Sequence, residues 1–504
     1  MVFNRKINST ITLEAVFYLL ISIFLIFVIA WGLTIGVQTH ELFEMFNESK
    51  GGLFLPLIWI YLVFATVAIL GGYYRRNASS VRIISYIFFL AFIPRIIVAL
   101  FGSYVPASDF ANYYKYGVCM RVGDLESVSD IIANYGLPNM GGIAIFNSVL
   151  MCFFSTSVVG FAIANGFITS CIGVVIYTIS KEFDKNIAFM AGILWAIYPT
   201  NVLASSVFDN HHGATLFMLI SVWLLYKSSG LHGWKKWVVV ALAAMSVVFS
   251  DMLHQSGILI VIAVVVFYML YIYRDIRNKD KSKLLDDLLT LSCYIFVYKG
   301  GSAVILSIFK SIGLANATET SIAIYLDKLV CGLDMENRGR STSISLRYLP
   351  EEEQISTGIA ILKEDCSSIK ELIKLFIDKI DYQWFSPNNL IYFYFKSILE
   401  GETIVDDLSI IENRYIALQG LDLIWIRIIY FFSIVGIIIK NNKSKLTDFM
   451  ILFIFGQVAF FMLTETQSRY RYESEPFLII LAAIGLVTVY RCLKRRVSLV
   501  CKQV

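Results

Sequence analysis

The sequence predicts an all-α polytopic membrane protein with about 12 to 14 transmembrane helices, external juxtamembrane helices and a small external loop domain. Of its 504 residues, 57% are hydrophobic and only 16% are charged, whereas a soluble domain has about 45–50% apolar and about 25% charged residues. The apolar residues form long runs without the period-two alternation of a β-barrel. Runs near the length that crosses about 30 Å of hydrocarbon lie at 13–38, 53–72, 83–102, 139–156, 158–180, 187–207, 213–226, 237–253, 256–273, 286–309, 421–439, 447–463 and 477–492.

Basic residues set the expected orientation, because cytoplasmic loops of membrane proteins are enriched in Lys and Arg. Segments 39–52 and 103–138 carry more carboxylates than basic side chains, so we expect them outside. The residues that mark the cytoplasmic side are Arg75, Arg76, Arg82, Lys227, Lys235, Lys236, Arg274, Arg277, Lys279, Lys281, Lys283, Lys440, Lys443, Lys445, Arg491, Lys494, Arg495 and Arg496. A multi-pass protein of a plasma or inner membrane is expected, with an uncleaved first span.

This orientation conflicts with the number of apolar runs. Both termini are expected inside, which requires an even number of crossings, but the runs are odd in number. The flanking charges place the conflict between residues 139 and 207. One of the three runs there is expected to be re-entrant, to lie along the surface or to join its neighbour. Irregular backbone at membrane depth persists only where it is buried in protein or lines a water-filled cavity, so this region indicates a cavity.

Three parts of the chain follow from this pattern. Residues 1–311 are expected to form a transmembrane module with an external catalytic loop at 103–138, and residues 421–504 to form C-terminal transmembrane helices. The hydrophilic region 312–420 between them is expected to be an external cap, with an amphipathic helix near 367–380. Cys331 and Cys366 share this region, and the sequence leaves open whether they pair.

The first motif with chemical potential follows the third apolar run and reads Ser108-Asp109-Phe110-Ala111-Asn112-Tyr113-Tyr114. A carboxylate at the boundary between water and hydrocarbon can act as a general base toward a hydroxyl. Tyr113 and Tyr114 offer flat faces for a sugar or for lipid headgroups. The alternative is a solvated carboxylate beside interfacial tyrosines.

The second motif places Asp209 and His211 between apolar runs at an expected external end. Ionisable groups in such a place are functional-site candidates, and these two are the candidates for a metal site, although a metal needs more ligands than these. The alternative is a helix start that Asp209 or Asn210 caps. His254, on a short external turn, is a further candidate that could contact a phosphate.

The third motif reads Arg469-Tyr470-Arg471 and precedes the last apolar run. Two arginines on the external side depart from the usual charge distribution, and a phosphate ligand would explain them because guanidinium binds phosphate bidentately. The alternative is that the arginines pair with nearby carboxylates, namely Glu465, Glu473 and Glu475.

Together the three motifs resemble the GT-C superfamily of integral-membrane glycosyltransferases, which includes protein O-mannosyltransferases and lipid A aminoarabinose transferases. That group has an acidic residue in its first large external loop, and Asp109 looks like it. Its later Pro…Asp passage is similar to the segment from Pro199 to His211, and its Arg-Tyr pair before a final helix is similar to Arg469-Tyr470. Asp109 follows the third span instead of the first, which is a departure from the superfamily.

The resemblance implies an enzyme that transfers a sugar from a polyprenyl-phosphate donor to an acceptor hydroxyl on the external face, with inversion. Asp109 would be the general base, and the arginines would stabilise the leaving phosphate. The acceptor, whether glycan, lipid or protein, is left open, and membrane lipids are expected partners. No cofactor is implied with certainty, because His211 stands where some relatives have a second carboxylate, which puts a metal-dependent mechanism in doubt. No nucleotide-binding loop is present, and no nucleic-acid partner is expected.

Three other functions are weighed against the same features. A polysaccharide polymerase or ligase also uses external arginines on lipid phosphates. A flippase for lipid-linked glycans would also have many helices and a polar cavity, but it would be expected to carry charges or broken helices in matching halves. A non-enzymatic envelope assembly protein would tolerate changes at Asp109 and Arg469.

Overall fold

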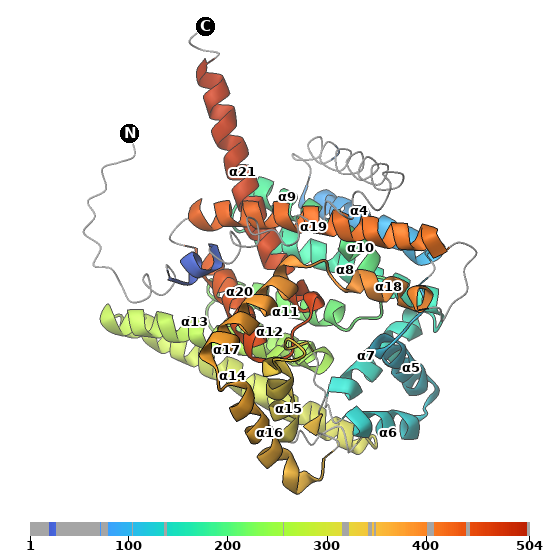
Figure 1. The fold of residues 1–504 in the computed structure, drawn as a ribbon. Helices are drawn as coiled ribbons and strands as arrows, with labels where there is room; N and C mark the ends of the chain where they lie inside the picture. Colours follow the sequence, from blue (N-terminus) through green and yellow to red (C-terminus); the bar gives the residue numbers. More distant parts are fainter. Residues whose placement is uncertain are drawn as a thin grey trace.

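The computed structural model describes residues 20–26, 71, 79–102, 104–135, 139–255, 257–314, 322–340, 345–346, 349–400, 408–439 and 444–500. These residues form helices and connecting turns and contain no strand (Figure 1). The prediction of an all-α fold is therefore confirmed for this part of the chain. Of the first predicted span, 13–38, the structure describes residues 20–26, which are helical, and of the second, 53–72, it describes only residue 71.

Eight helices in the described part are long and apolar enough to cross a membrane. They are α4 (Ser80–Phe101), α8 (Val158–Ser180), α12 (Trp234–Leu253), α13 (Gly257–Arg277), α14 (Lys281–Ser311), α19 (Leu408–Ile439), α20 (Lys445–Leu463) and α21 (Glu475–Val500). A polytopic membrane protein is thus supported, and the number of 12 to 14 crossings stays a prediction.

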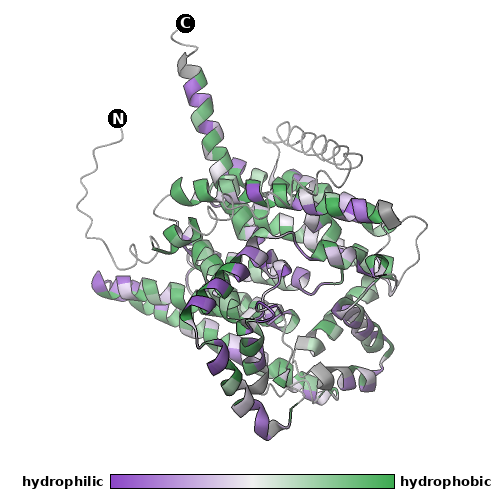
Figure 2. Cartoon of the chain, in the orientation of Figure 1, coloured by the Kyte–Doolittle hydropathy of each residue, from purple (hydrophilic) through white to green (hydrophobic). Residues whose placement is uncertain are grey.

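Shorter helices complete the fold. Between α4 and α12 they are α5 (Asp109–Val122), α6 (Leu125–Tyr135), α7 (Asn139–Phe154), α9 (Lys185–Ala196), α10 (Pro199–Ala204) and α11 (His211–Ser228). After α14 they are α15 (Ile322–Leu333), α16 (Glu351–Asp365), α17 (Ile369–Ile380), η3 (Asp381–Phe385), α18 (Leu390–Leu399) and η4 (Ser468–Glu473). Figure 2 shows hydrophobic residues along much of the long helices, with hydrophilic residues on α5, α16 and α17 and toward the end of α21.

The position of α7 explains why the number of apolar runs is odd although both termini are predicted to lie on the cytoplasmic side. Lys181, just after α8, donates a hydrogen bond to Ser80 at the start of α4, so these two ends lie together. The other end of the bundle holds α5, which packs along α7 (Figure 1). The Tyr114 hydroxyl on α5 donates to the Thr156 carbonyl just after α7, and Gly141 near the start of α7 lies against Phe309 at the end of α14. Both ends of α7 therefore lie at the α5 end of the bundle, and α7 does not run between the two ends.

The third run in this region, 187–207, is broken in two. Helix α9 ends at Ala196 and α10 begins at Pro199. Proline has no N–H to donate and favours the first position of a helix. The residues around the break are buried, as irregular backbone at membrane depth requires. The break leads into the short loop that carries Asp209.

The predicted amphipathic helix near 367–380 is present as α17. Its Lys379 is buried, and its ammonium group donates to the carbonyl oxygens of Gly332, Met462 and Thr464 at 2.6, 2.9 and 2.7 Å. These bonds fasten region 312–420 to the end of α20. Cys331 is buried, Cys366 is exposed, and both are free thiols in this structure.

The orientation predicts how single cysteines will react in a variant that lacks the eight native cysteines. A cysteine in place of the exposed Arg121 at the end of α5 should react with a membrane-impermeant maleimide in intact cells. A cysteine in place of the exposed Lys283 at the start of α14 should react only after permeabilisation. The opposite pattern would show that the α5 end of the bundle faces the cytoplasm.

Candidate active site

The three sequence motifs meet at the α5 end of the bundle. Asp109 begins α5, Asp209 lies in the loop between α10 and α11, and Arg469 lies in η4 between α20 and α21. His254, the C-cap residue of α12, joins them. Segments up to 360 residues apart in the sequence therefore form one cluster.

Asp109 and Arg469 lie next to each other at the exposed side of this cluster. A terminal guanidinium nitrogen of Arg469 lies 3.8 Å from a carboxylate oxygen of Asp109. The Asp109 side chain is 46% exposed, whereas that of Arg469 is 9% exposed. A distance of 3.8 Å is longer than a hydrogen bond. The carboxylate is thus accessible from solvent, and the arginine is close to it without a hydrogen bond between them.

Arg469 is held by aromatic rings and by its own backbone. Its guanidinium carbon lies 5.0 Å from the ring centroid of Phe110 and 5.1 Å from that of Phe393. Its backbone N–H donates to the side chain of Asn389 at 3.0 Å. Its Nε is buried and has no hydrogen-bond partner in the described structure. A buried donor without a partner is rare in folded proteins, so this guanidinium has capacity left for an anion.

Asp209 is buried behind this pair. One of its carboxylate oxygens accepts the N–H of His211 at 3.1 Å, and the other has no hydrogen-bond partner in the described structure. Burial raises the pKa of a carboxyl group, but the charges of His211 and Arg469 outweigh burial and hold the pKa of Asp209 below its usual value. Asp209 is therefore a buried anion with one oxygen unpaired.

His211, His254 and Glu473 converge on one point beside Asp209. The Nδ1 atoms of His211 and His254 lie 3.3 and 3.0 Å from the same Glu473 oxygen, Oε1. The three residues offer ligand atoms that all lie within 4.8 Å of one another. Zinc bonds to His nitrogen and carboxylate oxygen are about 2.0–2.2 Å long, which puts tetrahedral ligand atoms roughly 3.3 Å apart. The donor types and their spacing fit a divalent ion, and Asp209, with its unpaired oxygen, is a fourth possible donor.

The same groups shift one another's pKa. Burial lowers the pKa of an imidazole, but the carboxylates of Asp209 and Glu473 outweigh burial at His211, whose pKa is raised. At His254, burial and the charge of His211 prevail, so its pKa is lowered. Burial raises the pKa of Glu473, but the two imidazoles outweigh it and hold that pKa well below its usual value. The cluster thus keeps a carboxylate ionised between two imidazoles that differ in basicity.

His212, the neighbour of His211, has a different role. Its Nδ1 lies 2.9 Å from the Tyr472 hydroxyl and its Nε2 lies 3.0 Å from the Ala204 carbonyl oxygen. Both ring nitrogens are therefore used within the protein, and His212 packs η4 against α10 and α11.

Arg471 points away from the cluster. Its side chain is fully buried and pairs with Asp422 at 2.9 Å and with Glu475 at 3.4 Å. It also donates to the carbonyl oxygens of Gln383 and Ser386. Of the two arginines, only Arg469 reaches the opening. The pairing with Glu475 that the sequence offered as an alternative is present for Arg471.

The tyrosines of the motifs line the cluster in different ways. Tyr470 stacks on Phe461 with ring centroids 5.0 Å apart and lies 5.8 Å from the His211 ring. Tyr113 lies near Asp109, whose charge, after burial, adds to the raised pKa of its phenol. Tyr114 stacks on Phe208, the residue before Asp209, at 5.2 Å. These rings form the walls of the site.

Several residues of the site escaped the sequence analysis. Asn389 and Phe393, which hold Arg469, lie in the expected cap; Phe393 belongs to an aromatic cluster of the sequence, 392–395, that was not assigned to the site. Glu473 was considered only as a partner for arginine. Asp422 did carry a signal, since a carboxylate within an apolar run is a functional or structural site by default.

The buried pairs of Arg471 predict a large effect of its removal on stability. Arg471→Ala leaves Asp422 and Glu475 buried without their counter-charge, a type of change that costs about 3–5 kcal/mol. The thermal unfolding midpoint in detergent should fall by many degrees, or the variant should fail to accumulate. Arg491→Ala is the control, because Arg491 pairs with Asp184 at the surface and such pairs contribute about 0–1 kcal/mol. Equal midpoints for the two variants would contradict this role of Arg471.

Comparisons with known proteins give a distant likeness. No protein-family model matches the chain, and no curated protein matches its sequence. One similar solved structure is the archaeal oligosaccharyltransferase AglB from Archaeoglobus fulgidus in complex with an inhibitory peptide and a dolichol-phosphate, with 13% identity and a TM-score of 0.44 over 82% of this chain and 51% of that chain. The oligosaccharyltransferase of the same organism in the apo form is 12% identical, with a TM-score of 0.44 over 84% and 52%. The chain spans about half the length of these proteins, and a likeness of this degree establishes neither a family nor a function.

Proposed function

We propose that this protein is a membrane glycosyltransferase that moves a sugar from a polyprenyl-phosphate donor to an acceptor hydroxyl. The proposal rests on one observation, the convergence of an exposed carboxylate and a buried, incompletely hydrogen-bonded arginine. Asp109 comes from the first motif and Arg469 from the third, and 3.8 Å separates them. Sugar transfer from a lipid phosphate needs a base for the acceptor and a cation for the leaving group.

The reaction can be written in full with these two residues. The acceptor hydroxyl gives its proton to the Asp109 carboxylate, and its oxygen bonds to the anomeric carbon of the sugar. The bond between that carbon and the phosphate oxygen breaks on the opposite side, so the configuration inverts. The lipid phosphate leaves with the bonding electron pair, and Arg469 stabilises the charge that develops on it. Because the Arg469–Asp109 contact is long, an arriving phosphate can take the guanidinium and free Asp109 for the acceptor.

The other predicted site residues take supporting roles in this proposal. Tyr113, Tyr114 and Tyr470 would contact the sugar or the lipid through their rings. Arg471 would position η4 without touching the phosphate, since its donors are used by Asp422 and Glu475.

A divalent ion would fit beside these groups. His211, His254 and Glu473 would hold it, with Asp209 next to them. When bound, such an ion would supply positive charge for phosphate oxygens.

Loss of the base tests the central assignment. Asp109→Asn keeps the shape of the side chain but removes the basic lone pairs, and loss of a general base costs about 10²–10⁴ in rate. Mass analysis of envelope glycans from cells with the gene, without it and with Asp109→Asn should show that the variant matches the deletion at normal protein level. Glycans identical to wild type in the Asn variant would exclude this role for Asp109.

Substitution of Arg469 tests the phosphate contact. Arg469→Lys keeps the charge but loses the planar fork, so it should retain part of the transfer rate, and Arg469→Ala very little. A charge-assisted hydrogen bond of this kind contributes about 1.5–3 kcal/mol, which corresponds to roughly 10-fold to 150-fold in donor affinity or rate. The measurement is the transfer rate against donor concentration. An unchanged rate and donor affinity in the Ala variant would contradict the contact.

The ligand cluster predicts metal binding that can be measured without any transfer assay. Equilibrium dialysis of the purified protein against Zn²⁺ or Mn²⁺ should detect one bound ion, and His254→Ala should weaken the binding at least about tenfold. His232→Ala is a control, because His232 lies in the loop between α11 and α12. Equal binding by wild type and His254→Ala would show that the three residues hold no ion.

A further inference from the structure

A pocket lies at the opposite end of the bundle from the candidate active site. It is formed by the ends of α11, α12, α13, α14 and α20 and has an empty volume of about 610 Å³, part of it open to solvent. Helix α12 runs from this pocket, near Lys236, to His254 at the site. Its 20 residues span about 30 Å, so the two sites lie near opposite faces of a bilayer.

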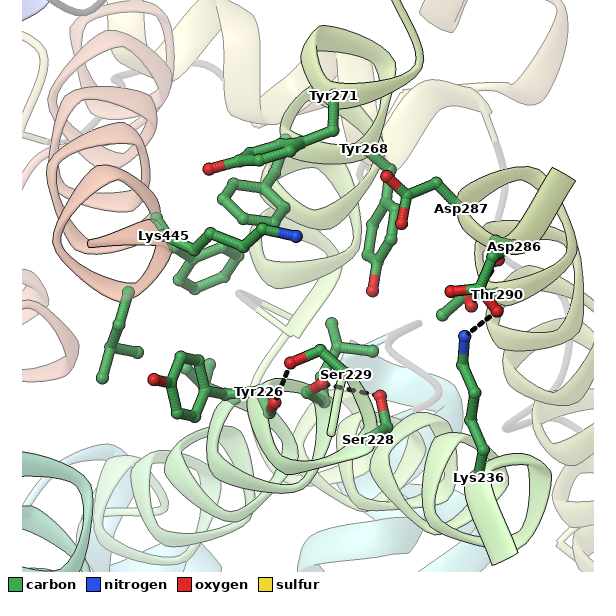
Figure 3. Close-up of a pocket in the computed structure, with 15 residues that line it drawn as sticks. Tyr226, Ser228, Ser229, Lys236, Tyr268, Tyr271, Asp286, Asp287, Thr290 and Lys445 are labelled. Carbon is green, nitrogen blue, oxygen red and sulfur yellow. Dashed lines mark hydrogen bonds and ion pairs between the residues drawn. The ribbon is translucent and has the colours of Figure 1, made fainter. Parts of the chain in front are cut away.

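The wall of the pocket changes from apolar to charged toward its opening. Its inner part is lined by Val222, Leu225, Phe267, Leu446 and Phe449. Its outer part carries Lys236, Asp286, Asp287 and Lys445, with hydroxyl groups between them (Figure 3). This order matches the boundary between acyl chains and headgroups.

Tryptophans mark the same boundary on the outside of the bundle. Trp234 begins α12 next to the pocket and is 71% exposed, and Trp237 follows one turn later. Tryptophan is enriched at the level of lipid headgroups. The opening of the pocket thus lies at headgroup depth, on the side that the basic residues predict to be cytoplasmic.

Two of the four charges at the opening have no ion-pair partner among the described residues. Lys236 and Asp286 pair with each other. Lys445 and Asp287 reach toward the space from α20 and α14, from opposite walls (Figure 3), and no described residue forms an ion pair with either of them within 4.0 Å. A ligand that carries one negative and one positive group would satisfy both.

The hydrogen-bond acceptors in the pocket favour a ligand with a primary ammonium group over one with a quaternary ammonium group. The carboxylate of Asp287 and the hydroxyl of Tyr268 accept hydrogen bonds, which a quaternary ammonium cannot donate. An aromatic cage, the usual site for a quaternary ammonium, would need a free ring face. The Tyr271 ring already has Lys445 Nζ at 4.5 Å from its centroid and the Arg274 guanidinium at 4.0 Å.

We propose that this pocket binds a phospholipid of the phosphatidylethanolamine class from the cytoplasmic leaflet. The phosphate lies against Lys445, the ammonium group against Asp287 and Tyr268, and the acyl chains along the apolar wall at Phe267 and Phe449. The bound lipid fills the space between α13, α14 and α20 and stabilises their packing. This lipid site lies apart from the candidate active site, and the proposal does not depend on the proposed transfer reaction.

Binding to the purified full-length protein in detergent tests the proposal. The probes are the dioctanoyl forms of phosphatidylethanolamine, phosphatidylcholine and phosphatidylglycerol. Inorganic phosphate and free ethanolamine are tested separately as water-soluble fragments of the headgroup. Affinity is measured by native mass spectrometry, and the unfolding midpoint by thermal denaturation. Phosphatidylethanolamine should bind most tightly and raise the unfolding midpoint. Neither inorganic phosphate nor ethanolamine alone should raise the midpoint by the same amount.

Charge-neutral variants distinguish the two ends of the headgroup. Asp287→Asn should weaken phosphatidylethanolamine binding about 5-fold to 10-fold and leave phosphatidylglycerol binding unchanged, and Lys445→Gln should weaken both by about the same factor. Matched controls are Asp280→Asn and Lys281→Gln, which change the same charges at the start of α14 outside the pocket. Folding of each variant is checked by its midpoint without lipid.

Three outcomes would overturn the proposal. The first is equal binding of all three lipids, and the second is a full shift with inorganic phosphate alone. The third is an Asp287→Asn variant that folds normally and binds phosphatidylethanolamine like wild type.

Discussion

The buried charge network around Arg471 is the interaction on which the candidate site depends. Arg471 joins Asp422 on α19, Glu475 at the start of α21 and two backbone carbonyl groups ahead of α18. Removing a charge from water costs several kcal/mol unless partners replace the hydration, so the network holds only when these segments are in place together. It fixes η4, which carries Arg469 and Glu473.

The geometry of η4 then separates the roles of neighbouring residues. A 3₁₀-helix has three residues per turn, so Tyr470 and Glu473 share one face, which meets His211 and His254. Arg471 occupies a second face and points into the core. Arg469 occupies the third and points to Asp109. One short helix thereby supplies a structural cation, a phosphate candidate and a metal-ligand candidate.

Burial divides the two aspartates of the site. Asp109 is half-exposed at the start of α5, where a molecule from solvent can reach it. Asp209 is 4% exposed and has the charges of His211 and Arg469 nearby, which keep it ionised. A buried anion beside imidazoles suits a cation, whereas an accessible carboxylate suits a base. The break between α9 and α10 makes this difference possible, because it carries Asp209 into the interior.

The sequence by itself determined the membrane class, the helical fold and the neighbourhood of Asp109, His211 and Arg469. These properties depend on composition, on the length of apolar runs and on charged residues beside apolar runs, where burial of a charge is energetically unfavourable. Each of these features can be read from a short stretch of sequence. The tertiary structure decided which arginine faces Asp109, because Asp422 and Glu475 enclose Arg471 whereas Arg469 lies 3.8 Å from Asp109. It also decided that α7 stays at one end of the bundle and that Glu473 meets two imidazoles. Glu473 lies 219 positions from His254 and 262 from His211, and no local sequence pattern encodes such a pairing.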